Sequence, residues 1–185
     1  MPLSAPKGRQ PVHTRTVVCQ GFRRDDGLWD IEGRLTDVRS RPLPLGERGL
    51  LAAGEPMHDM RIRLTIDDTF LIHEVEAVTD SGPYAACGAI APNFQRLVGL
   101  RIGAGWRRAV KERVGGVQGC THLVELLGPL ATTAFQVVYL AVLNAGGDVT
   151  FGNGKRPVLL DSCHMLASDG EAVRQEWPDH YTGDR

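Results

Sequence analysis

A cysteine and a histidine lie two residues apart where the glycine-rich stretch GGVQG (115–119) gives way to a long apolar segment. A thiol at the start of a helix feels the partial positive charge of unpaired backbone N–H groups, which favours the thiolate. Cys120 could therefore be a nucleophile or a soft metal ligand. The alternative is a buried cysteine that packs as a small hydrophobic residue. His122 converges with Cys120 only if the cysteine still lies in the turn, because residues two apart on a regular helix point about 200° apart.

Other residues in the chain are candidates for the same kind of chemistry. His58 and Asp59 are adjacent, and both are good ligands for zinc or iron, while Asp59 could equally orient a histidine. Cys87 lies in a tight Ala-Cys-Gly turn and offers a further thiolate. Each has a non-functional alternative, in which the histidine faces solvent, the aspartate ends a loop and the thiol is simply buried. Cys163 and His164 are also adjacent, and at most one of them serves a given site, since neighbours in extended structure point apart.

The composition limits the classes of function. The chain has 185 residues, a formal net charge of -1, 42% hydrophobic residues and 23% charged residues, the balance of an ordinary globular protein. Without a basic surplus, nothing favours nucleic-acid binding. The N-terminal segment has no apolar signal region, and no stretch is expected to reach the roughly 20 apolar residues that span a bilayer. We therefore expect a cytoplasmic protein that binds neither nucleic acid nor a membrane, with its four cysteines free or bound to metal.

Apolar periodicity predicts strands first and helices later. Residues 16–36 alternate around the turn sequence DDG, and residues 60–78 alternate around a second Asp-Asp turn, so both are predicted hairpins. Helices are predicted at 92–98, at 106–114 and, with a kink or break at Pro129, at 121–143. The expected fold class is α+β, with one antiparallel sheet from the N-terminal hairpins covered on one face by C-terminal helices. The sheet surface left open makes a homodimer the expected assembly.

Nearly the whole chain resembles a bacterial family defined by a domain of unknown function. The segments that carry the resemblance are DGLWDIEGRLTD, GEPMHDM, AVTDSGPY, AIAPNFQRLVGLRIG and GCTHLVELLGPLATTAFQ. The resemblance implies an association with proteobacteria and actinobacteria that degrade aromatic compounds. It implies no particular activity.

Residues 58–138 are also similar in layout to the iron–sulfur scaffold proteins of the NifU and IscU type. In those proteins a hairpin follows an aspartate-containing ligand turn, a second cysteine precedes a short helix, and a third opens a long C-terminal helix. By this resemblance Asp59 falls on the ligand turn, Cys87 on the second cysteine and Cys120 on the third. The implied organisation is a single domain over 1–185, with an N-terminal arm (1–12), a scaffold-like core (58–138) and a C-terminal extension (144–185).

The sequence departs from the scaffold pattern at two ligand positions. The first cysteine is missing, with Met57 or His58 in its neighbourhood, and Gly119 stands in place of a histidine that His122 could replace. Two thiolates instead of three make a weak cradle for a 2Fe–2S cluster. The resemblance instead implies a mixed nitrogen, oxygen and sulfur site of the kind that zinc or iron accepts. Its implied ligands are His58, Asp59, Cys87, Cys120 and His122.

The leading hypothesis is a metal-dependent enzyme of small-molecule catabolism, because a metal with an open position can polarise a carbonyl or activate water. A lyase that cleaves a C–C bond in retro-aldol fashion, or a hydrolase, would suit such a site, with aromatic or apolar substrates. Expected catalytic residues are His58, His122 and Tyr84, and expected pocket residues are Trp29 and Arg15. One alternative is a non-catalytic iron–sulfur or zinc carrier that docks to a partner protein. Another is a metal-free enzyme in which Cys120 is the nucleophile.

Overall fold

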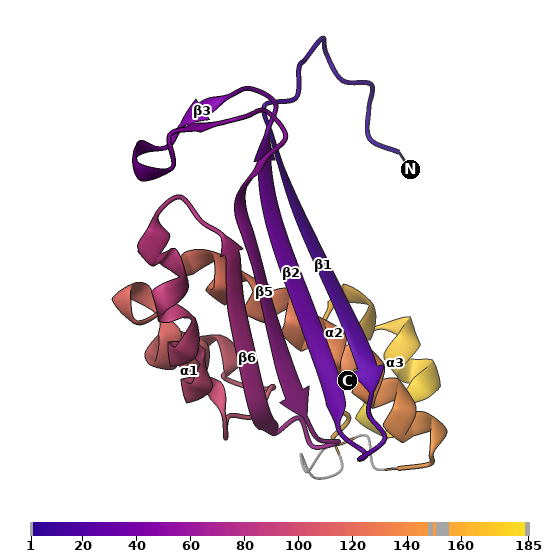
Figure 1. Ribbon diagram of the computed structural model, residues 1–185. Coiled ribbons are helices and arrows are strands. Elements are labelled where there is room, and N and C mark those ends of the chain that lie inside the picture. Colours follow the sequence, from indigo (N-terminus) through magenta and orange to yellow (C-terminus); the bar gives the residue numbers. More distant parts are fainter. Residues whose placement is uncertain (1, 148–149, 151–155, 184–185) are drawn as a thin grey trace. The chain divides into compact units, whose positions relative to one another are not determined.

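The computed structural model describes residues 2–147, 150 and 156–183. A four-stranded antiparallel sheet dominates it, with the strand order β1-β2-β5-β6 (Figure 1). Its strands are β1 (His13–Arg23), β2 (Trp29–Arg39), β5 (Pro56–Ile66) and β6 (Ile72–Ser81). Two short strands, β3 (Leu43–Pro44) and β4 (Leu50–Leu51), pair separately on either side of the 3-10 turn η1 (Gly46–Arg48). The two long hairpins confirm the antiparallel sheet that the periodicity predicts.

Helical segments follow the strands in the sequence, which confirms the α+β class. They are η2 (Ala85–Leu97), α1 (Trp106–Val114), η3 (Gly116–Gln118), α2 (Thr121–Asn144), η4 (His164–Leu166), α3 (Glu171–Glu176) and η5 (Pro178–His180). The bounds of α1 are those predicted, whereas the helix predicted at 92–98 begins earlier, at Ala85, and ends at Leu97 as a 3-10 helix. α2 continues across Pro129 instead of breaking there. Because Pro129 is exposed, the backbone carbonyl that loses its helical partner lies on a side open to water.

The chain consists of two compact units, Met1–Val138 and Tyr139–Arg185. The boundary falls inside α2. Every candidate site residue named above lies in the first unit, except Cys163 and His164. In the second unit the backbone N–H of Ser168 and the side chain of Arg156 both donate to the carboxylate of Asp161, and the Cys163 side chain is exposed.

One face of the sheet forms the core of the first unit, where α2 runs across it (Figure 1). The side chains on this face alternate with exposed ones along each strand, as expected of a half-buried sheet. Buried strand residues include Ile31 and Leu35 on β2 and Met60, Ile62 and Leu64 on β5, and those of α2 are Leu123, Leu126, Leu127, Leu130, Ala134 and Val138. Gly33 allows the close approach of the helix, since a Cβ there would lie 3.1 Å from the Leu130 side chain.

The other face of the sheet is lined by cross-strand ion pairs. Arg34 on β2 pairs with Asp59 on β5, Arg61 on β5 pairs with Asp80 on β6, and Arg63 bridges Glu32 and Glu76. The pairs of Arg61 and Arg63 are exposed and contribute about 0–1 kcal/mol each, so their main effect is to keep this face polar, whereas the Asp59 side chain is largely buried. The homodimer expected from an open sheet surface stays a prediction.

Within the described part of the chain, α2 alone is long and apolar enough to cross a membrane by length and composition. From the sequence, no apolar stretch is expected to be long enough to span a bilayer, but α2 has 24 residues. One such helix is weak evidence of a membrane span, because the core helix of a soluble protein passes the same test; six residues of α2 are buried, but most of its apolar window is not.

The turn between β5 and β6 is organised by the carboxylate of Asp67. Its Oδ1 accepts hydrogen bonds from the backbone N–H and the hydroxyl of Thr69 (2.8 and 2.6 Å) and from the N–H of Leu71 (3.1 Å), while Nε2 of His73 lies 2.8 Å from Oδ2. Burial by itself raises the pKa of Asp67, but these hydrogen bonds outweigh it and lower the pKa to about 2.

We predict that Asp67 contributes to the loss of stability in acid. Its native pKa lies below the roughly 3.9 of an unfolded aspartate, so its contribution is complete above about pH 5 and disappears as the pH falls toward 2. Urea denaturation of Asp67→Asn should therefore show a deficit in unfolding free energy at pH 7 that shrinks toward pH 3. An equal deficit at both pH values would contradict the assignment.

Candidate metal centre

The candidate site is built around Asp37, which lies on β2 with its side chain fully buried (0% exposed). The strand register places Arg15 of β1 directly opposite it on one side and His58 of β5 directly opposite on the other. Residues opposite each other in an antiparallel sheet share a face, so all three side chains project toward the side covered by α2. The pairing of β2 with β5 shifts just after Asp37, which marks the end of the regular sheet at this point.

Four nitrogen atoms surround the carboxylate of Asp37. Its Oδ1 lies 2.9 Å from His13 Nε2 and 2.8 Å from Arg15 Nε, and its Oδ2 lies 2.8 Å from Arg15 Nη2 and 2.9 Å from His58 Nδ1. Burial raises the pKa of Asp37, but the hydrogen bonds from Arg15, His58 and His13, together with the charge of Arg15, hold it well below its ordinary value. The carboxylate is therefore ionised throughout the physiological pH range.

The first turn of α2 completes the site from the opposite side of the core. His122 Nε2 lies 3.8 Å from Asp37 Oδ2, and Glu125, three residues further along the same face, accepts a hydrogen bond from Arg15 Nη1. A tight connection between η3 and α2 positions this first turn. The chain at Gly119 passes so close to the end of α1 that a Cβ there would lie 1.9 Å from the carbonyl oxygen of Val114. Only glycine fits there, so the sequence GGVQG brings α2 to the sheet at a fixed position.

The two histidines stack on each other beside the carboxylate. The ring centroids of His58 and His122 are 3.7 Å apart, with 30° between the ring planes. Burial, and then the proximity of His122, lower the pKa of His58, and the attraction of Asp37 opposes this only in part. A neutral imidazole at neutral pH is the form that binds a metal ion.

Cys120 lies at the edge of this cluster. Its carbonyl oxygen accepts the first helical hydrogen bond, from the N–H of Val124 (2.9 Å), so the residue caps α2 rather than lying within it. From there its Sγ is 3.9 Å from His122 Nδ1 and 3.7 Å from the sulfur of Met60. The convergence of the cysteine and the histidine, which requires the cysteine to lie in the turn, is thus present.

Asp37, His58 and His122 form the group of potential metal ligands that the described residues contain. One ligand atom from each lies within 4.8 Å of the others. Tetrahedral bonds of about 2.1 Å place neighbouring ligand atoms about 3.4 Å apart. The contacts of Asp37 Oδ2 with His58 Nδ1 (2.9 Å) and His122 Nε2 (3.8 Å) lie on either side of that value. All three ligand atoms lie within 4.8 Å of one another, so side-chain adjustment would allow them to bind one ion.

Asp59 is placed differently from the sequence expectation. It follows His58 on β5, so its side chain lies on the opposite face of the sheet, where its two oxygens accept hydrogen bonds from Arg34 (2.8 and 2.6 Å). Asp37 occupies the position beside the histidines that the sequence interpretation gave to Asp59. Alternation along a strand is the physical reason, because two adjacent strand residues do not face one site.

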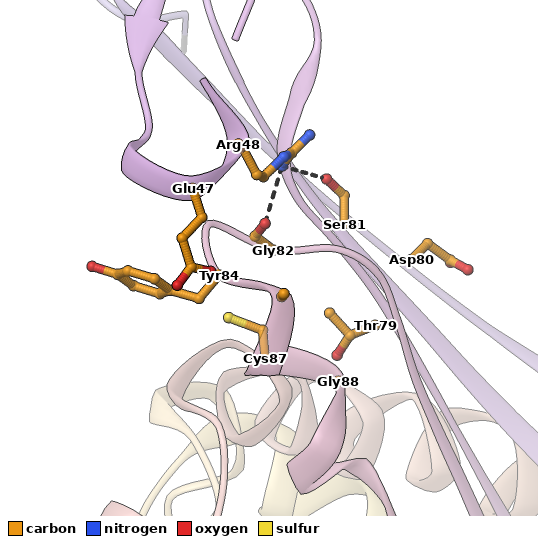
Figure 2. Close-up of a pocket in the computed structure, with 10 residues that line it drawn as sticks. Glu47, Arg48, Thr79, Asp80, Ser81, Gly82, Tyr84, Cys87 and Gly88 are labelled. Atoms are coloured by element: carbon orange, nitrogen blue, oxygen red, sulfur yellow. Dashed lines mark hydrogen bonds between the residues drawn. The ribbon is translucent and has the colours of Figure 1, made fainter. Parts of the chain in front are cut away.

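Cys87 and Tyr84 line a separate surface hollow of about 340 Å³ (Figure 2). The Cys87 side chain packs against Gly82, where a Cβ would lie 2.7 Å from the Cβ of Cys87. Arg48 also lines the hollow, and its Nη1 donates a hydrogen bond to the carbonyl oxygen of Gly82 (3.1 Å). Tyr84 is 64% exposed. Cys87 is thus not part of the three-ligand group around Asp37, nor is Tyr84.

The two expected pocket residues lie at opposite ends of the sheet. Arg15 belongs to the site, but as a partner of Asp37 and Glu125. Trp29 is buried at the far end of β2, where its Nε1 donates to Asp68 (2.7 Å). His13, Asp37 and Glu125 are the site residues that the sequence interpretation missed.

The sequence profile of a family described as "Protein of unknown function (DUF2889)" matches residues 13–136. That span is more than half of the chain, so the chain belongs to this family, as its motifs indicate. The match begins at the first residue of β1 and includes every residue around Asp37. No curated protein and no solved structure matches the chain.

We predict that Arg15 is more important to stability than an exposed arginine with the same hydrogen bonds. Arg15→Gln leaves the buried carboxylate of Asp37 without its cation, which should lower the unfolding free energy by on the order of 3 kcal/mol. Arg61→Gln is the matched control, because it removes a two-point arginine–aspartate pair in which both side chains are exposed, and it should cost about 1 kcal/mol or less. Urea denaturation of both variants at pH 7 makes the comparison, and equal losses would show that Asp37 does not depend on Arg15.

Proposed function

We propose that the chain is a metal-dependent enzyme acting on a small molecule, with His58, His122 and Asp37 as the ligands of a zinc or iron ion. The observation that supports this most directly is the convergence of two imidazoles and one ionised carboxylate within 4.8 Å in a largely buried site. Two histidines and a carboxylate are a ligand set of hydrolytic zinc sites and of non-haem iron(II) sites.

The charge balance of the site supports a cation. The carboxylates of Asp37 and Glu125 face one guanidinium, that of Arg15, which leaves one negative charge in excess when the histidines are neutral. The four nitrogen contacts of Asp37 occupy most of its acceptor positions. An ion between His58 Nδ1 and Asp37 Oδ2 would replace the hydrogen bond that now joins them, and the single proton of the neutral imidazole would then lie on Nε2.

Each surrounding residue has a role that follows from its contacts. Arg15 and His13 hold Asp37 ionised and fixed in orientation, and Glu125 fixes Arg15 in turn. Asp37 and His58 are shielded from water, whereas the His122 side chain is 23% exposed, so the solvent side of the site lies next to His122. A bound ion with an open position there would polarise a carbonyl or lower the pKa of a water. Hydrolysis and retro-aldol C–C cleavage are the reactions we propose for aromatic or apolar substrates.

A metal-free thiol enzyme is the second candidate, because of one specific arrangement. Cys120 Sγ, the two ring nitrogens of His122 and Asp37 Oδ2 form a chain with contacts of 3.9 and 3.8 Å. A cysteine, a histidine that can take its proton and a carboxylate that orients the histidine are the parts of a nucleophilic site. Both contacts would have to shorten for proton transfer.

The carrier hypothesis has less support. Cluster carriers hold their iron with several thiolates, whereas the three-ligand group found among the described residues contains no cysteine. Cys87 and Cys120 line different hollows of the surface. An iron–sulfur or zinc carrier stays a prediction from the sequence.

Elemental analysis of purified variants tests the proposed ligand set. We expect about one zinc or iron ion per chain in the native protein, and a loss of most of it in His58→Ala, His122→Ala and Asp37→Ala. His73→Ala and Cys87→Ser are the matched controls, because both residues lie outside the cluster and should leave the metal content unchanged.

Two results would overturn the proposal. Metal-free native protein, even when purified without oxygen and supplied with zinc and iron, would leave the thiol enzyme as the better candidate. In that case alkylation should occur at Cys120 and be slowed by His122→Ala. Loss of metal in Cys87→Ser but not in His122→Ala would place the ion elsewhere.

A further inference from the structure

A hollow of about 300 Å³ lies between α1 and the start of α2, next to the metal centre. Its wall on α1 is a single helix face, formed by Arg107, Val110, Lys111 and Val114. Val124 and Cys120 line it from α2. A buried hydrogen bond of 3.0 Å from the ring nitrogen of Trp106 to the carbonyl oxygen of Leu127 joins the two helices.

Apolar and cationic groups are separated within this hollow. Val110 and the half-buried Val124 provide an apolar floor above the buried Val114, whereas Arg107 and Lys111 are exposed and lie one helical turn apart. Like charges at this spacing repel each other. Arg107 and Lys111 have no ion pair among the described residues, while Arg108, their neighbour on α1, pairs with Glu112 (2.8 Å).

The carboxylate that also lines the hollow does not neutralise these cations. Glu125 is bonded to Arg15 on the side of the metal centre. The hollow therefore offers two unpaired positive charges above an apolar floor. Its volume is at the lower end of the range for pockets that bind small molecules.

We propose that this hollow binds the substrate, and that the substrate is a small organic anion with an apolar body. The apolar body contacts Val110 and Val124, and the anionic group lies between Arg107 and Lys111. The assignment of this ligand as the substrate rests on the function proposed above. Cys120 makes the connection, because it lines the hollow and its Sγ lies 3.9 Å from His122 Nδ1. A molecule bound in the hollow would thus be separated from the metal-binding residue His122 only by the side chain of Cys120.

Ligand-observed NMR with benzoate tests the inference, with its neutral counterpart benzyl alcohol and with inorganic phosphate as comparison probes. We expect benzoate to bind native protein more tightly than either comparison probe, because benzyl alcohol lacks the negative charge and phosphate lacks the apolar body. The double variant Arg107→Gln/Lys111→Gln should weaken benzoate binding about tenfold, and added salt should weaken binding to the native protein. Val110→Trp should abolish binding by filling the hollow.

Arg108→Gln is the matched control, because it removes a cation from the same helix but outside the hollow, and it should leave benzoate affinity unchanged. Circular dichroism of every variant establishes that it is folded. No benzoate binding to native protein, or equal binding to the native protein and the folded double variant, would overturn the inference. All titrations are made with the protein as purified and repeated after chelator treatment. Benzoate binding that survives chelation reports on the hollow, whereas the metal content of the purified protein reports on the metal centre.

Discussion

The burial of one ionised carboxylate is the constraint on which the rest of the structure depends. Asp37 is fully shielded from water, and a charge in that position is stable only if it is paired and hydrogen-bonded. The antiparallel register supplies Arg15 and His58 from the strands on either side, and His13 adds a further contact from β1. The aspartate thereby ties the three strands together at one end of the sheet. The same contacts keep it ionised, which is what a metal ligand or an orienting carboxylate requires.

The helix that covers the sheet converts this structural charge into a candidate reactive site. α2 begins where GGVQG allows a close approach to the end of α1, and its first turn brings His122 beside His58. Cys120 is left at the cap, between the histidine and the hollow that α1 and α2 enclose. The site therefore combines a shielded interior, which controls charge, with an accessible edge, which can admit a small molecule. This division of roles is common to metal-dependent enzymes and to thiol enzymes.

Much of the fold follows from local sequence patterns, and part of the site does as well. Period-two alternation and Asp-containing turns predict both hairpins, and the apolar pattern with its terminal glycines predicts α1 to the residue. His58 and His122 are recognisable from residue type. Asp37 had a signal too, because it continues the inward-facing series of Ile31 and Leu35 on β2. A charged residue at an inward position needs a partner, and that requirement could have identified it.

Other features depend on information that local patterns do not contain. The pairing of β2 with β5 places Asp37 opposite His58, and this long-range register is set by the packing of the whole sheet. The same register leaves Asp59 with Arg34 on the other face.

The central claim, that Asp37, His58 and His122 hold one ion, is tested most directly by anomalous X-ray diffraction from crystals of native protein at the zinc and iron edges. We expect a single peak between these three side chains, within bonding distance of all of them. A peak beside Cys87, or none in crystals grown with both metals, would contradict it.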